Sequence, residues 1–366
     1  MTPTTRRPTR SRRQRRSPAV TIHDVAARAG VSVATVSRVL NGKELVREET
    51  SQQVRAAAKS LRYVPNVAAR SLSIRRTQTI GVVLPDVHGE YFSEVIRGID
   101  VDARRGGYHI LVSGSHSDPA EMLAVVEAMR GRVDGLIVMA PDLAPSALRE
   151  QLVTDTPLVL LSSVDDAHDA ITIDNYGGAR QMMQHLITLG HRHIAFIKGP
   201  ANNGDARERL RGYRQAMRGI GGTAASRALE LDGDFTERAG HDACSVLTEM
   251  KPRPTAVFAA NDSMAVGVLA ALTECGIDVP REMTVTGFDD IPIAHYVTPA
   301  LTTVRVDIAE VGRRAFALLH DAIEESNQPK RQECIRTALV VRKSCAPPEA
   351  KPKNSASPRR RKGEES

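Results

Sequence analysis

Residues 20–41, VTIHDVAARAGVSVATVSRVLN, decide how the first part of the chain folds. Gly30 sits in the middle of this stretch and permits the positive φ that a tight turn needs. Two apolar stripes at helical spacing flank it, formed by Ile22, Val25 and Ala26 before the glycine and by Val36, Val39 and Leu40 after it. The pattern predicts a helix-turn-helix, although the spacing alone is equally typical of an ordinary helical hairpin.

Polar residues mark where the helices of this head begin and end. Thr21 can cap the first helix, with Asp24 three residues later supporting the cap. Ser32 can cap the second helix, expected over Val33–Leu40. A third helix is expected over Glu48–Leu61, because Pro65 disfavours helical structure just before it.

Charge is distributed unevenly along the 366 residues. Residues 1–18 contain seven arginines and no acid, and residues 19–76 are also net basic, yet the whole chain carries only +7. Residues 77–345 must therefore be net acidic. A basic head on an acidic body indicates a polyanion-binding module joined to a body with another task. The arginine-rich leader is interpreted equally well as a solubilising arm or as a source of non-specific DNA affinity.

Several classes of protein are disfavoured by what the sequence lacks. No apolar run approaches the roughly 18–20 residues that span a bilayer, and the basic N-terminus lacks the apolar stretch of a secretory signal. We therefore expect a cytoplasmic protein without a membrane partner. The four cysteines form no CxxC pair and have no histidine at zinc-finger spacing, so no metal site is expected. No phosphate-loop or serine-nucleophile motif is present, so we expect neither a cofactor nor catalysis.

From residue 79 onward, short β-branched runs alternate with helical patterns. This alternation predicts parallel sheets with helices on both faces, and its length predicts two such subdomains. The expected strands are Ile80–Leu84, His109–Val112, Gly135–Met139, Leu158–Leu161, Ile171–Ile173, His193–Ile197, Thr255–Phe258 and Met283–Phe288. The expected helices include Tyr91–Arg105, Gly177–Leu189, Ala206–Gly219, Phe235–Met250 and Asn261–Cys275. Ligands of such sheets bind beyond the carboxyl ends of the strands.

The strings DVAARAGVSVATVSRVLNG and RYVPNVAARSL resemble the DNA-binding head and hinge of the LacI family of bacterial repressors. The resemblance continues to about residue 343. It implies an all-α helix-turn-helix headpiece followed by an α/β core like a periplasmic binding protein, with two doubly wound parallel-sheet subdomains. The implied division is a leader at 1–18, the headpiece at 19–64, a hinge at 65–76, a core at 77–345 and a basic tail at 346–366. Chain crossings between the subdomains are expected near 175, 300 and 330.

The resemblance also implies which residues contact DNA. Val33 and Ala34 occupy base-reading positions at the start of the recognition helix, and both suit a thymine methyl. Arg38 matches the family's base-reading arginine, whose expected partner is guanine. The remaining expected contact residues would bind phosphates or cap helices: Thr21, Ser32, Ser37 and Asn41. For Thr21 and Ser32, helix capping is at least as good an interpretation. In the hinge, Ala69 permits close approach and Leu72 matches the leucine that wedges into the minor groove.

In the core, the matched positions predict an effector site at the strand ends. Its expected members are Tyr91, Phe92, Asp174, Arg209, Phe235, Asn261 and Asp289. Acids, an amide, one arginine and aromatic rings suit a small polyhydroxylated ligand. Asn203 and Asp205 depart from the arginine and threonine of the purine repressor, which favours a sugar or sugar derivative over a purine. For Phe235 and Tyr91, packing in the core remains an alternative role. For Asp262, the alternative is capping of a helix. Arg207 or Arg211 could take the place of Arg209 in the effector site.

One headpiece makes too few base contacts for a unique genomic address, so a homodimer on a palindromic operator is expected. The helices that follow Tyr91 and Asn261 match the family's dimer interface. Effector binding would close the cleft and change operator affinity through the hinge, either inducing or co-repressing. The rival classes are a sugar-binding receptor without a regulatory role, and an enzyme using Asp289 and Asp290. A secreted receptor would have an export signal and would lack a helix-turn-helix, and this sequence shows the reverse. The enzyme is disfavoured because paired acids at a strand end are more commonly hydroxyl binders.

Overall fold

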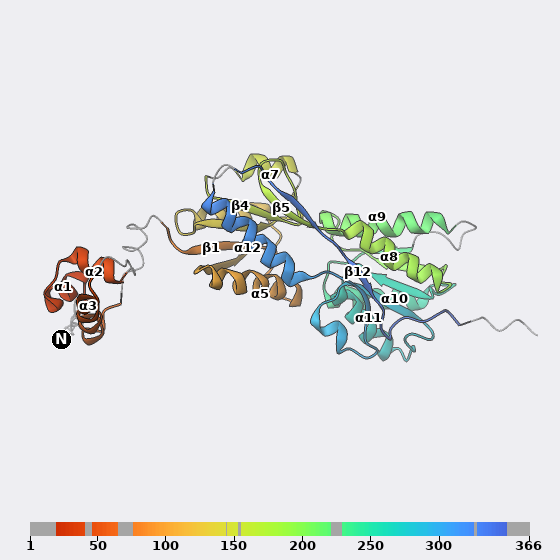
Figure 1. The fold of residues 1–366 in the computed structure, drawn as a ribbon. Helices are drawn as coiled ribbons and strands as arrows, with labels where there is room; N and C mark the ends of the chain where they lie inside the picture. Colours follow the sequence, from red (N-terminus) through yellow and green to blue (C-terminus); the bar gives the residue numbers. More distant parts are fainter. Residues whose placement is uncertain are drawn as a thin grey trace, which may run out of the picture. The chain divides into compact units, whose positions relative to one another are not determined.

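The structure is a computed structural model that describes residues 20–40, 46–64, 76–143, 145–152, 155–220, 229–325 and 328–349 (Figure 1). The chain divides into two compact units, one ending at Thr77 and the other starting at Gln78. Each unit has its own core, and each is described by itself below. No helix among the described residues is both long and apolar enough to cross a membrane.

The first unit is a bundle of three helices: α1 (Ile22–Ala29), α2 (Val33–Leu40) and α3 (Glu48–Ser60). Its core contains Val25, Val36 and Val54, none of which is exposed to solvent. Gly30 closes α1 with a φ of 66°, a left-handed conformation in which a side chain would be strained. The two stripes therefore face each other across this glycine turn, as expected of a helix-turn-helix.

The helix caps form locally. The Asp24 carboxylate accepts hydrogen bonds from the backbone N–H and the hydroxyl of Thr21, both at 2.8 Å. The Ser32 hydroxyl accepts a hydrogen bond of 3.1 Å from the backbone N–H of Thr35. Each cap satisfies donors that the first turn of a helix cannot pair internally.

The second unit contains two six-stranded sheets. The first sheet is parallel throughout, in the order β11-β5-β4-β3-β1-β2. Its strands are β1 (Thr79–Leu84), β2 (His109–Gly114), β3 (Gly135–Met139), β4 (Leu158–Leu161), β5 (Asp169–Ile173) and β11 (Gln332–Ile335). Helices α5 and α12 pack together on one face, while α6 and α7 share a separate apolar cluster on the other. They span α5 (Glu90–Arg105), α6 (Pro119–Met129), α7 (Pro145–Gln151) and α12 (Ile308–Glu324).

The second sheet has the order β12-β10-β9-β8-β6-β7, and only its edge strand β12 is antiparallel. Its strands are β6 (Ile194–Ile197), β7 (Leu229–Leu231), β8 (Ala256–Ala259), β9 (Thr284–Asp289), β10 (Thr302–Arg305) and β12 (Ala338–Val340). Helices α8 and α9 pack against each other on one face, and α10 and α11 on the other (Figure 1). They span α8 (Asn175–Thr188), α9 (Gly204–Gly219), α10 (Glu237–Glu249) and α11 (Asp262–Glu274), and a short 3₁₀ helix η2 covers Pro292–His295.

The chain passes between the two sheets three times. It does so after β5, between β10 and α12, and between β11 and β12. The first and third passages lie side by side, because the Asp174 N–H donates to the Ile335 carbonyl at 3.0 Å. The passages were expected near 175, 300 and 330, and in the structure they follow Ile173, Arg305 and Ile335. The expected fold class, a helix-turn-helix head with two doubly wound subdomains, is confirmed.

Candidate DNA-binding surface and effector cavity

Helix α2 presents part of the expected base-reading set. Ala34 and Arg38 are exposed and one helical turn apart, and Arg38 has no ion-pair partner among the described residues. Ser37 is half-buried between them. Val33 is also half-buried and packs against the core of the head, so its side chain is less available than expected. Asn41, Ala69 and Leu72 lie outside the described residues.

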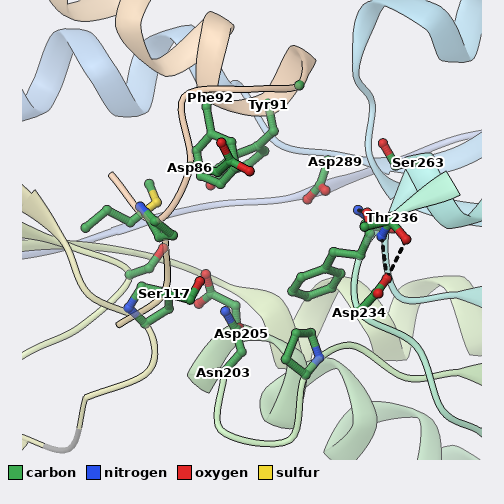
Figure 2. A pocket seen from close by; sticks show the side chains of 18 of the residues that line it. Asp86, Tyr91, Phe92, Ser117, Asn203, Asp205, Asp234, Thr236, Ser263 and Asp289 are labelled. Carbon is green, nitrogen blue, oxygen red and sulfur yellow. Dashed lines mark hydrogen bonds between the residues drawn. The ribbon is translucent and has the colours of Figure 1, made fainter. Parts of the chain in front are cut away.

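The second unit contains a cavity of about 320 Å³ between its two sheets. Its wall comes from the loops that follow β1, β2, β3 and β4 in the first sheet and β6, β7, β8 and β9 in the second. These are the carboxyl ends of parallel strands, where open α/β sheets bind ligands. Six of the expected effector residues line it: Tyr91, Phe92, Arg209, Phe235, Asn261 and Asp289. In Figure 2, Tyr91 and Phe92 lie on one side of the cavity, with Asn203 and Asp205 on the other.

Asp174 does not line the cavity, and the expectation that it binds effector is corrected. It is the N-cap of α8, and its carboxylate accepts a hydrogen bond of 2.8 Å from the Gly177 N–H. The side chain is therefore used locally, at the point where the chain leaves the first sheet.

Arg209 is held in one orientation by three groups. Its Nε donates to Asn175 Oδ1 at 2.8 Å, and its Nη1 donates to the Ala260 carbonyl at 2.6 Å. Its Nη2 lies 2.9 Å from Asp289 Oδ1. The guanidinium also stacks on Phe288, with 3.8 Å between its carbon and the ring centroid. With only 4% of its side chain exposed, Arg209 is a fixed part of the cavity floor.

Asp289 faces the cavity with an unsatisfied oxygen. Its Oδ1 is in ion-pair contact with Arg209, but no N–H is aligned with it, so it has no hydrogen-bond partner among the described residues. Burial raises the pKa of Asp289 to about 6, and Arg209 limits the rise. A ligand that donates a hydrogen bond at this oxygen would complete the site.

Two adjacent residues of α11 have structural tasks. Asn261 caps the helix by accepting from the Met264 N–H at 3.0 Å, and its amide nitrogen donates to the Phe235 carbonyl at 2.9 Å. Asp262 is fully buried and binds the Thr303 hydroxyl and the Ile291 N–H. The cap thus belongs to Asn261, where the sequence suggested Asp262.

Strained backbone is found at the cavity. Ser162, Phe235 and Asp289 have φ values of 57°, 73° and 111°, and all three line it. Non-glycine residues in this region cost free energy and persist where the surrounding structure holds them.

Several cavity residues were not predicted from the sequence. They include Asp142 after β3 and Ser162 after β4, whereas Asn203 and Asp205 after β6 were considered only as positions that depart from the purine repressor. Asp205 accepts a hydrogen bond of 2.7 Å from Asn175, and burial raises its pKa. Applying the strand-end rule to every strand, rather than only to matched positions, would have identified them.

The first and second subdomains are the parts of the second unit built around the first and second sheets. Two backbone N–H groups of the second subdomain donate hydrogen bonds to the first beside the cavity. The Gly204 N–H, at the start of α9, donates to the Pro141 carbonyl at 2.8 Å. The Ile293 N–H, in η2, donates to the Glu90 carboxylate, also at 2.8 Å. Opening the cleft would break both.

Asp289 predicts a pH dependence of stability. Its pKa of about 6 in the folded chain exceeds the ordinary value of 3.8, so the folded chain keeps this proton to a higher pH than the unfolded chain. The stability contributed by Asp289 is therefore present below about pH 4 and is lost as the pH rises through about 6. Relative to the wild type, Asp289→Asn should become progressively more stable from pH 4 to pH 7. Urea unfolding of both proteins at several pH values measures the difference, and a constant difference would contradict the assignment.

A helix-turn-helix head joined to two doubly wound sheets with a cavity between them is the architecture of a ligand-responsive DNA-binding regulator. A model of bacterial regulatory proteins of the lacI family matches residues 21–66, and a periplasmic binding protein-like domain matches residues 183–345. The chain belongs to the lacI family.

Two relatives and one solved structure show how far the similarity extends. The transcriptional repressor PurR of Edwardsiella ictaluri is 36% identical over 332 residues, covering 89% of this chain and 97% of the relative. The ribose operon repressor of Escherichia coli K12 is 37% identical over 317 residues, covering 86% and 95%. A crystal structure of the lac repressor dimer, bound to operator and the anti-inducer ONPF, matches with a TM-score of 0.80 at 30% identity, covering 90% and 99%. The family expected from the sequence is confirmed.

Proposed function

We propose that this protein is a transcriptional repressor whose affinity for a palindromic operator is set by a small molecule in the cavity between its two sheets. One observation supports this proposal most: both subdomains contribute to the wall of the cavity, and the same chain has a helix-turn-helix in its first unit. A ligand in contact with both walls favours one separation of the subdomains over another. Because the chain enters β1 directly from the expected hinge, that change can reach the headpiece.

The proposed effector is a sugar or sugar derivative. The cavity combines aromatic surface at Tyr91, Phe92 and Phe235 with carboxylates and hydroxyl groups that accept and donate hydrogen bonds. Each sugar hydroxyl can use both kinds of partner. A purine is the alternative suggested by the PurR relatives, but a flat base would be served better by rings on both of its faces.

The proposed assembly is a homodimer, as in the lac repressor structure. Two headpieces related by a dyad double the base contacts on a palindromic site. Of the two expected interface helices, α5 exposes the apolar side chain of Val101, whereas most of α11 is buried within its own subdomain. We therefore place the interface mainly on α5.

We propose that the protein acts at DNA in the cytoplasm and that it is not an enzyme. Its relatives are transcriptional repressors. The side chains around the cavity anchor each other through Arg209 and Asn175, an arrangement that suits binding without turnover.

The experiment has two stages. Selection of DNA duplexes from a random pool by the full chain should enrich a palindrome, and sedimentation should give a dimer. Titration of that complex with a panel of sugars and purines, followed by fluorescence anisotropy, should then identify a molecule that changes operator affinity. Equal retention of all duplexes would overturn DNA recognition, while operator binding that no small molecule changes would overturn only the effector control.

Arg38 is the residue on which base discrimination should depend most. We expect Arg38→Ala to weaken binding to the selected operator about 10- to 100-fold, because a bidentate arginine–guanine contact contributes about 1–3 kcal/mol. Binding to a scrambled duplex should change much less. Arg28→Ala is the matched control, since Arg28 is an exposed arginine on α1. Equal losses on operator and scrambled DNA would contradict a base-reading role.

A further inference from the structure

The charge of the cavity wall is unbalanced. Among the described residues that line it, carboxylates are numerous and Arg209 is the one arginine. Some of these carboxylates have local donors: Asp234 accepts from the backbone and hydroxyl of Thr236, and Glu90 accepts from Ile293. For three other carboxylates of the wall, burial raises the pKa: Asp142, Asp205 and Asp289.

Two of these acids belong to opposite walls of the cleft. Asp142 follows β3 in the first subdomain, and Asp205 lies in the first turn of α9 in the second. The residues directly before them are in contact across the cleft, because the Gly204 N–H donates to the Pro141 carbonyl at 2.8 Å. Like charges across a cleft oppose its closure, unless a proton or another cation lies between them.

Two arginines among the described residues act on this pair from different sides. Arg209 lowers the pKa of Asp205 but makes its ion pair with Asp289. Arg207 does not line the cavity; its charge lowers the pKa of Asp142, and its Nη1 donates to the Asn202 carbonyl. The direct partners of the two acids are neutral: Asn175 and Ser162 donate to Asp205, and Asn203 and Ser117 donate to Asp142.

The remaining wall also suits a cation. Tyr91 and Phe92 pack edge to face with their ring centroids 5.5 Å apart, and Phe235 contributes a third ring. Aromatic faces attract ammonium groups. An ammonium group has three donors and no acceptor, so it matches a wall rich in carboxylates. An anionic ligand such as a sugar phosphate would meet several carboxylates and no free arginine.

We propose that the effector carries a protonated amine, as an amino sugar does, and that its ammonium group bridges Asp142 and Asp205 when the cleft closes. This inference rests on the proposed function, because it takes the cavity to be the effector site. It names the chemical class of the ligand and assigns its recognition to two residues. The carboxylate pair then acts as the selective element, since a neutral sugar leaves the repulsion between the walls in place.

Calorimetric titration of the full chain at pH 7.0 tests the proposal. The probes are glucosamine and galactosamine, the neutral sugars glucose and galactose, and N-acetylglucosamine, whose nitrogen carries no charge. We expect at least one amino sugar to bind tenfold or more tightly than its neutral counterpart. Asp205→Asn, and separately Asp142→Asn, should remove that advantage. Asp232→Asn is the control, because Asp232 is exposed, pairs with Lys198 and does not line the cavity.

The outcomes separate this inference from the proposed function. Neutral sugars that bind as tightly as amino sugars would overturn the amine and leave the sugar-controlled repressor intact. An amino-sugar advantage that survives in both variants would overturn the assignment to Asp142 and Asp205. Absence of binding by every probe would overturn the amino-sugar effector and count against a sugar effector as well. Thermal unfolding of each variant confirms that it is folded before its titration is interpreted.

Discussion

Replacing Arg209 with alanine should lower the free energy of unfolding of the core by about 3–5 kcal/mol, the usual loss when one partner of a buried ion pair is removed. The variant would leave the Asp289 carboxylate buried without its cation, since Arg209 and Asp289 have only 4% and 6% of their side chains exposed. It would also leave Asn175 Oδ1 and the Ala260 carbonyl without the donors that now occupy them. The chain has no tryptophan, so urea unfolding is best followed by circular dichroism.

Two further variants distinguish the anchoring role from a general effect of removing an arginine from α9. Arg209→Lys keeps the positive charge but cannot reach three acceptors in one plane, so an intermediate loss is expected. Arg211→Ala removes an arginine whose side chain is 62% exposed and whose ion pair with Glu208 is at the surface. Arg211 also lies over the Tyr176 ring, with 4.2 Å between its guanidinium carbon and the ring centroid, so its loss should cost about 1 kcal/mol. If Arg209→Ala cost no more than Arg211→Ala, Arg209 would not be the anchor of the cavity.

The predicted elements of the fold were those with a clear apolar period. The strands expected at Gly135–Met139 and Leu158–Leu161 have the same bounds in the structure, because both are continuously buried apolar runs. The strands that were not predicted are edge strands or polar ones. In β11 exposed and half-buried residues alternate over Gln332–Ile335, β7 and β12 have three residues each, and β10 is rich in threonine. Such strands are stabilised by their neighbours in the sheet, which one stretch of sequence does not reveal.

The candidate site was predictable where a residue type and a strand end coincided. Asp289 was expected at a strand end, Arg209 and Phe235 were expected because they match effector positions of the family, and all three line the cavity. Asp174 met the same criterion but caps α8, since an acid directly between a strand and a helix can serve either purpose. Asp205 and Asp142 could not be paired from the sequence. Their proximity depends on which loops of two separate sheets face each other, and that is a property of the three-dimensional arrangement alone.

Replacing Gly98 with valine should destabilise the first subdomain by about 3 kcal/mol or more, at the upper end of the cost of overpacking. Gly98 lies on α5 where this helix crosses α12, and a Cβ added there would be 2.1 Å from the Ala309 carbonyl oxygen. The same crossing brings Gly312 against α5, where a Cβ would be 2.3 Å from the Val95 carbonyl oxygen. Because both obstacles are backbone atoms, no side-chain rotation can relieve them, and the helices would have to move apart.

This displacement should also reach the cavity, because α5 carries Tyr91 and Phe92 in its first turn. Gly98→Ala should show a smaller loss, since about 1 kcal/mol of helix propensity offsets part of the clash. Gly219→Ala is the matched control, because Gly219 is also helical and, apart from its own helix and chain neighbours, no atom of the described residues lies within 4 Å of its added Cβ. We expect that control to be neutral or slightly stabilising in urea unfolding. If Gly98→Val were as stable as Gly219→Ala, α5 and α12 would not pack as closely as the structure has them, and the aromatic wall of the cavity would be placed by other contacts.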